Sequence, residues 1–214
     1  DHKIEKMRIA DAATGEVKEI FEEKVTTQYE SGQGTINNRF LDASNEIIWY
    51  SERDDWGHLY LYDATTGKLK SQITKGAFVV TQLLKVDEKN RVLYFNANGR
   101  EKGRDPYFSH FYRIGFDGKN LELLTPEVGN HNISLSPDGK YFVDNFSQPN
   151  VPTVSVLRDM KGKLITELEK ADISALTVTG WKPAEPITVK SRDGRWDLYG
   201  LMFVPSTLKK KKKY

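Results

Sequence analysis

Asp11-Ala-Ala-Thr14-Gly15 returns almost unchanged as Asp63-Ala-Thr-Thr66-Gly67, 52 positions later in the chain. Weaker copies of the same turn occur at Asp117-Gly118 and Lys161-Gly162, so the turn glycines follow one another at intervals of 52, 51 and 44 residues. Each copy lies between two runs of residues that favour strands, where glycine supplies the positive φ of a tight hairpin. A repeat of this length is typical of the blades of a β-propeller.

A second kind of polar turn recurs out of phase with the first. Residues 42–45, 87–90 and 136–139 are polar, and each group precedes a run of aromatic and β-branched residues. Such runs after polar turns predict strands. Two turns and their flanking runs give four strands per repeat, which is the content of a propeller blade. The sequence therefore predicts an all-β fold, a partial β-propeller of about three to four four-stranded blades followed by a β-hairpin.

The predicted blades divide the chain into two parts. Residues 1–25 read as the outer hairpin of a truncated blade, residues 26–38 as a polar connector, and fuller blades span about 40–74, 79–124 and 131–168. Pro183 and Pro186 mark a boundary, because proline stiffens the chain and interrupts strand pairing. Residues 187–205 then read as a two-stranded hairpin of another module. We expect domains at 1–182 and 183–214, and a chain that is a piece of a longer protein.

Composition excludes several classes of function. The 214 residues carry a formal charge of +2, which includes the five lysines Lys209 to Lys213, so the rest of the chain is mildly acidic and no nucleic-acid partner is expected. The lysine run reads as a solvated tail. The absence of cysteine excludes disulfides and thiol nucleophiles, and it is compatible with cytoplasm or periplasm.

Two stretches resemble a known family. Residues 49–63, Trp49-Tyr-Ser-Glu-Arg-Asp-Asp-Trp-Gly-His-Leu-Tyr-Leu-Tyr-Asp63, look like the blade signature of dipeptidyl peptidase IV-type members of the prolyl oligopeptidase (S9) family of serine peptidases. Residues 188–205 resemble the crossing where these enzymes leave the propeller and begin an α/β-hydrolase domain. The resemblance implies that residues 1–182 are the C-terminal part of the propeller and that residues 183–214 are a linker and the start of the peptidase domain.

The resemblance also implies a function for a longer parent protein. In this family an eight-bladed propeller caps a hydrolase whose Ser-His-Asp triad releases N-terminal Xaa-Pro or Xaa-Ala dipeptides. No Gly-x-Ser-x-Gly nucleophile elbow occurs in this sequence, so we expect no catalytic residues here and no activity from this chain alone. Its expected role is to gate access and help position peptide substrates.

Partners and location follow from the same resemblance. The expected partners are peptide substrates, the parent's own C-terminal hydrolase domain and, in the parent, a second copy; the expected location is periplasmic or secreted. An acylaminoacyl peptidase or prolyl oligopeptidase is a related alternative. The alternative of another class is a non-enzymatic propeller scaffold for protein binding, TolB-like or WD-type.

Arg39 and Phe40 are the candidate substrate-binding residues, because they resemble a position at which the family's propeller faces the substrate cavity. The structural alternative places Phe40 in the core between sheets. The family also uses a pair of glutamates in an aromatic, acidic motif that is not visible here. Glu22-Glu23 lacks the flanking Tyr and Trp, and it reads as solvated charge near a turn.

The remaining polar residues indicate structure rather than chemistry. The four charges of residues 52–55 are expected to pair and cap locally in a blade turn, and His58 and His110 are expected to be packing histidines in aromatic strands. The four histidines are far apart in sequence, so no metal site is predicted. No cofactor is expected. Six aromatic residues are expected to pack between sheets: Trp49, Trp56, Tyr60, Tyr62, Phe108 and Tyr112.

Overall fold

The computed structural model describes residues 2–26, 28–29 and 37–205. Much of the predicted connector around Gly32 and Gly34, and the lysine run Lys209 to Lys213, lie outside the described residues. The chain divides into two compact units, residues 1–125 and 126–214. The first unit carries the truncated blade and the first two full blades, and the second carries the third full blade and the hairpin.

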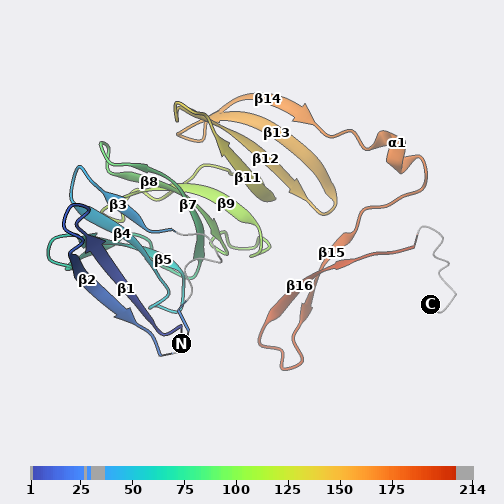
Figure 1. The fold of residues 1–214 in the computed structure, drawn as a ribbon. Helices are drawn as coiled ribbons and strands as arrows, with labels where there is room; N and C mark the ends of the chain where they lie inside the picture. The colour runs from blue at the N-terminus through green and yellow to red at the C-terminus, as the bar shows by residue number, and fades with distance from the viewer. Residues whose placement is uncertain (1, 27, 30–36, 206–214) are drawn as a thin grey trace. The chain divides into compact units, whose positions relative to one another are not determined.

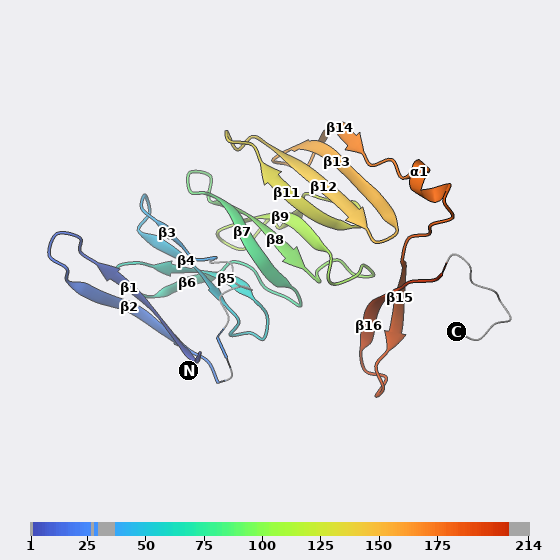
Figure 2. The same cartoon turned by 45° about the vertical axis from the view of Figure 1, so that its right-hand side comes forward.

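The first unit contains three antiparallel sheets, which Figures 1 and 2 show in sequence order. A two-stranded sheet comprises β1 (Ile4–Ala10) and β2 (Val17–Lys24). The next sheet has the order β3 (Arg39–Leu41), β4 (Glu46–Ser51), β5 (His58–Asp63) and β6 (Leu69–Gln72). The third has the order β7 (Val79–Asp87), β8 (Val92–Asn98), β9 (Ser109–Gly115) and β10 (Glu122–Leu123). Sequential order and four strands confirm two blades at the predicted places.

The second unit contains one further blade and a separate hairpin. Its four-stranded sheet has the order β11 (Asn130–Leu135), β12 (Tyr141–Gln148), β13 (Val151–Asp159) and β14 (Leu164–Lys170). A four-residue helix, α1 (Ser174–Thr177), precedes the paired strands β15 (Glu185–Lys190) and β16 (Asp197–Met202), which Figure 2 shows as a two-stranded ribbon. Among the described residues, no helix is long and apolar enough to cross a bilayer.

All four predicted turn glycines adopt the positive φ for which the sequence selects glycine. The φ values of Gly15, Gly67, Gly118 and Gly162 lie between 68° and 81°. The preceding aspartate helps to close the first two turns, because its Oδ1 accepts backbone N–H groups two and three residues later, as at Asp63. What recurs along the chain is therefore a hairpin turn closed by a glycine with positive φ.

Alternation along the strands builds two apolar layers in the first unit. One layer lies between the two full blades, and its bulkiest buried members are Tyr50, Phe78, Phe95, Tyr112 and Phe116. The other lies between the truncated blade and the first full blade, and it centres on buried Trp49. Each large ring that leaves water contributes roughly 1.5–3 kcal/mol or more, so these layers hold neighbouring blades together.

Two details of the prediction are wrong. Trp56 is 42% exposed and does not pack between sheets, whereas Trp49, Tyr60, Tyr62 and Tyr112 are buried as predicted. Trp56 lies in the turn between β4 and β5, beyond the strands that alternate into the core. Pro186 does not precede the hairpin but lies inside β15 opposite Leu201, which is tolerated because β15 is an edge strand whose free side needs no N–H donor. The domain boundary at residues 182–183 stays a prediction.

Candidate functional site

Arg39 and Phe40 lie in the three-residue strand β3 at the start of the first full blade. The Arg39 guanidinium donates to the carbonyl of Asn38 at 2.8 Å and to that of Leu83, in the next blade, at 3.4 Å. Phe40 is 42% exposed, while Leu41 is buried. The core alternative for Phe40 is therefore wrong, since the strand turns Leu41 inward instead. Contact of either residue with a substrate stays a prediction.

Glu23 is buried, which corrects the interpretation of Glu22-Glu23 as solvated charge. Both residues lie within β2; Glu22 is exposed and pairs with Lys6, but the Glu23 side chain is only 7% exposed. Its carboxylate accepts the indole N–H of Trp49 at 2.6 Å and the hydroxyl of Ser51. A buried carboxylate with these donors fixes β2 against β4 of the next blade.

Arg53 completes this polar cluster. Its guanidinium donates to Glu23 at 2.8 Å and to the Tyr62 hydroxyl at 2.8 Å, and it stacks over the Tyr60 ring at 4.3 Å. Asp54 accepts the Tyr60 hydroxyl at 2.8 Å. Burial, with Asp54 as acceptor, raises the pKa of Tyr60, so the phenol stays protonated. The expected local pairing is wrong for Arg53, whose partner Glu23 lies 30 residues away in sequence, whereas Asp54 bonds within its own blade.

His58 and His110 are packing histidines, as predicted, and both use a threonine on the following segment. The His58 Nδ1 lies 3.1 Å from the Thr74 hydroxyl, and its Nε2 lies 3.0 Å from the carbonyl of Gly76. His110 Nδ1 faces the Thr125 carbonyl at 3.2 Å. In both blades the threonine hydroxyl accepts the backbone N–H of the residue after the histidine, Leu59 or Phe111. Burial lowers the pKa of His58, which favours a neutral ring.

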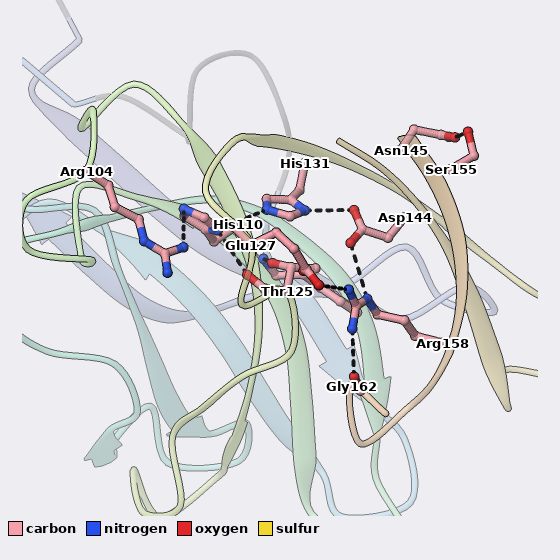
Figure 3. A network of polar contacts seen from close by, with 11 residues as sticks. Arg104, His110, Thr125, Glu127, His131, Asp144, Asn145, Ser155, Arg158 and Gly162 are labelled. Atoms are coloured by element: carbon pink, nitrogen blue, oxygen red, sulfur yellow. Dashed lines mark hydrogen bonds and ion pairs between the residues drawn. The ribbon is translucent and has the colours of Figure 1, made fainter. Parts of the chain in front are cut away.

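A different network lies inside the second unit, around His131 (Figure 3). The side chains of His131 and Asp144 are fully buried, with Nδ1 and Oδ1 2.8 Å apart, and the His131 Nε2 lies 3.1 Å from the Glu127 carbonyl. Arg158 donates to Asp144 at 3.4 Å, to the Glu127 carboxylate at 2.5 Å and to the Gly162 carbonyl at 3.1 Å. Both ring nitrogens of His131 therefore lie within hydrogen-bond distance of an oxygen, and the network ties β11 to β12 and β13.

A third charged group links the two full blades of the first unit. Glu46 in β4 is buried, and its carboxylate pairs with Lys70 of β6 and with Arg91 of the neighbouring blade. Burial by itself would raise the pKa of Glu46, but the hydrogen bonds from Arg91 and Lys70 outweigh it and lower the pKa to about 2. This carboxylate is therefore ionised throughout the physiological range.

These networks position the backbone and assemble no catalytic centre. Within the described ranges, no group of three or more His, Cys, Asp or Glu side chains could hold a metal ion. The hydroxyls that approach buried histidines or acids, Thr74 and Ser51, are themselves buried behind strands and engaged in hydrogen bonds. Nucleophilic catalysis needs an accessible hydroxyl beside a base. The networks around Glu23, Glu46 and His131 therefore hold strands and turns in place.

Comparison with known proteins decides the family. Residues 1–153 match the model of the dipeptidyl peptidase IV (DPP IV) N-terminal region. The chain belongs to this family. Curated relatives agree with this assignment. The chain is 31% identical over 140 residues to dipeptidyl peptidase 4 of Arthroderma otae and 30% identical over 143 residues to that of Trichophyton rubrum. Each alignment covers 61% of this chain and 17% of the relative, so the chain spans about a sixth of their length.

Solved structures agree with this assignment. A putative dipeptidyl aminopeptidase IV from Bacteroides ovatus superposes with a TM-score of 0.78 at 25% identity, covering the whole of this chain and 32% of that one. Dipeptidyl peptidase 4 of Porphyromonas gingivalis has the same TM-score at 23% identity, over 97% of this chain and 29% of that one, and supports the fold alone. The chain is a DPP IV-like propeller fragment, as the sequence predicts.

Proposed function

We propose that this chain is the non-catalytic propeller part of a DPP IV-like serine exopeptidase. It gates access to a Ser-His-Asp domain elsewhere in the parent and helps to position peptides for release of N-terminal Xaa-Pro or Xaa-Ala dipeptides. The observation that carries the proposal is the family match over residues 1–153, followed by a separate β15–β16 hairpin. A binding scaffold of the TolB or WD type accounts for the blades but gives no reason for such a hairpin.

The exposed side chains of the hairpin support a continuation into another domain. Ile187 and Val189 of β15 are 36% and 51% exposed, and Leu198 and Leu201 of β16 are 49% and 48% exposed. Apolar side chains on both strands of an isolated hairpin need a partner surface, because two strands alone bury too little to be stable in water. We infer that a hydrolase domain of the parent covers this hairpin.

The test compares the full-length gene product with the 214-residue chain. Each is incubated with Gly-Pro p-nitroanilide, with and without a serine-reactive phosphonate. The proposal requires cleavage by the full-length protein, its loss after phosphonate treatment, and no cleavage by the chain alone. A full-length protein that neither cleaves the amide nor reacts with the phosphonate supports the scaffold alternative instead.

The proposed substrate contact of Arg39 and Phe40 is tested in the same full-length protein. Arg39→Gln and Phe40→Ala are compared with Arg8→Gln, which changes an exposed arginine of β1. If either residue contacts the peptide, its replacement raises KM or lowers kcat/KM at unchanged thermal stability. Unaltered kinetics in both variants would remove these residues from the substrate site.

A further inference from the structure

A pocket of about 730 Å³ lies between the two full blades of the first unit. Leu61, Val92, Ile114 and Phe116 contribute apolar surface. Its polar lining includes Lys70, Arg91, Arg113, Asn90 and Asn120. We call this cavity the inter-blade pocket. A volume of this size is typical of sites for small molecules.

The lining of the inter-blade pocket carries three cations, Lys70, Arg91 and Arg113, and two carboxylates, Asp117 and Glu122. Lys70 and Arg91 both line it, and both pair with the single carboxylate of Glu46, which is buried. The side chains of Lys70 and Arg91 are nevertheless 45% and 42% exposed, so part of each cation remains accessible. Arg113 is balanced by Glu122, which also lines the pocket, and Asp117 in the lining lies 3.9 Å from Lys119.

Irregular backbone places both cations. Lys70 is the extra residue of a β-bulge, since Leu61 pairs with Ser71 and Tyr62 pairs with Leu69. Bulges re-aim the side chains of the bulged strand. A bulge also occurs three residues after the turn glycine in the last blade, where the extra residue is Ile165. The bulge is therefore a shared feature of these two blades, whereas the lysine at the bulged position occurs only in the first full blade.

Arg91 occupies a backbone conformation that arginine seldom adopts. Its φ is 58°, and it holds the place that Asn45, with φ 50°, holds in the equivalent turn of the preceding blade. Asparagine tolerates this region, while other residues with a Cβ lose roughly 1 kcal/mol or more there. The strained position brings the Arg91 guanidinium onto Glu46 and over the Phe116 ring at 4.2 Å. Strain of this kind is concentrated at functional sites.

We propose that the inter-blade pocket binds an oxyanion, a phosphate or carboxylate group, held by Lys70 and Arg91. Glu46 orients both cations from the buried side, and the anion binds the donors that each cation presents on its accessible side. Arginine suits this role because its planar guanidinium binds an oxyanion through two N–H groups while keeping donors for Glu46. The remaining volume accommodates the body of an organic anion, such as the C-terminal end of a short peptide.

The test is an NMR titration of the whole 214-residue chain at constant ionic strength. Sodium phosphate is exchanged for sodium chloride while the backbone N–H signals of Asn90, Arg91 and Asn120 are followed. The second probe is an N-acetylated dipeptide with a free carboxylate, compared with its C-terminal amide. Saturable shifts at these three signals with phosphate or the free carboxylate, and none with the amide, are expected. Phosphate binding alone assigns a free anion, and dipeptide binding assigns a peptide end.

Variants decide whether the two cations are responsible. Lys70→Gln keeps the Arg91–Glu46 pair and the fold, and it should weaken binding about tenfold, the effect of losing one hydrogen bond to a charged group. Arg91→Gln should weaken it further, and Arg8→Gln, in β1, should change nothing. Absence of saturable shifts up to about 50 mM of either probe overturns the proposal. So does undiminished binding in Lys70→Gln, or equal weakening in Arg8→Gln.

Discussion

Replacing Gly67 by alanine tests how the outer turn of one blade locks onto its neighbour. Gly67 closes the β5–β6 hairpin with φ 68°, and a Cβ built on it would lie 2.0 Å from the carbonyl oxygen of Ile20. Ile20 is the extra residue of a bulge in β2, since Met7 pairs with Phe21 and Arg8 pairs with Glu19. The carbonyl of Ile20 therefore occupies the space that a side chain at position 67 would need.

Gly15 provides the matched control. It closes the equivalent turn with φ 74° and the same hydrogen bond to the aspartate four residues earlier, but nothing lies within 4 Å of its built Cβ. Gly15→Ala therefore measures the backbone strain alone, about 1 kcal/mol. Ordinary contact begins near 3.4 Å, so Gly67→Ala must also move a backbone carbonyl by roughly 1.4 Å. Overpacking of this kind adds about 1–3 kcal/mol.

The measurement is urea unfolding of the two variants and the parent chain, followed by tryptophan fluorescence. Gly67→Ala is expected to lower the free energy of unfolding by about 2–4 kcal/mol, against about 1 kcal/mol for Gly15→Ala. At this chain length each kcal/mol corresponds to about 2–4 °C in Tm. Equal losses in the two variants would refute the reasoning, because the contact with Ile20 would then contribute nothing.

Two further predictions concern buried charge. Glu23→Ala leaves the indole N–H of Trp49 and the Arg53 guanidinium without their shared acceptor, so it should lower the free energy of unfolding in urea by about 2–4 kcal/mol. Glu22→Ala, at an exposed position, should change it little. Similar losses in the two variants would count against a buried role for Glu23. The pKa of Glu46 is lowered from 4.5 to about 2, so its contribution of about 3 kcal/mol to the free energy of unfolding is present above pH 4.5 and is lost as the pH falls towards 2. The free energy of unfolding of Glu46→Gln should therefore fall less steeply with decreasing pH than that of the parent chain. Identical pH profiles would contradict this.

Short-range chemistry made the blades predictable. The Asp-Thr-Gly turns require positive φ at one residue, and the flanking aromatic runs can only alternate as strands, so the turns and most strand positions follow from the sequence. The packing histidines were also predictable, because they lie within aromatic strands.

Longer-range contacts were not predictable in the same way. Glu23 resembles solvated charge because it follows another glutamate, and the partners that bury it, Trp49 and Arg53, lie 26 and 30 residues away. Phe40 lies in a strand of three residues, too short for alternation to show which side faces the core. The left-handed φ of Arg91 could have been suspected only by aligning its turn with the turn that ends at Asn45.

The most direct test of the proposed function identifies the products released from a peptide. The full-length gene product is incubated with a decapeptide that has proline at position two and a free N-terminus, and the products are analysed by mass spectrometry. Release of the N-terminal dipeptide, abolished when the N-terminus is acetylated, is the predicted result. Internal cleavage, release of an acylated residue, or an intact peptide would contradict assignment of this propeller to a dipeptidyl peptidase.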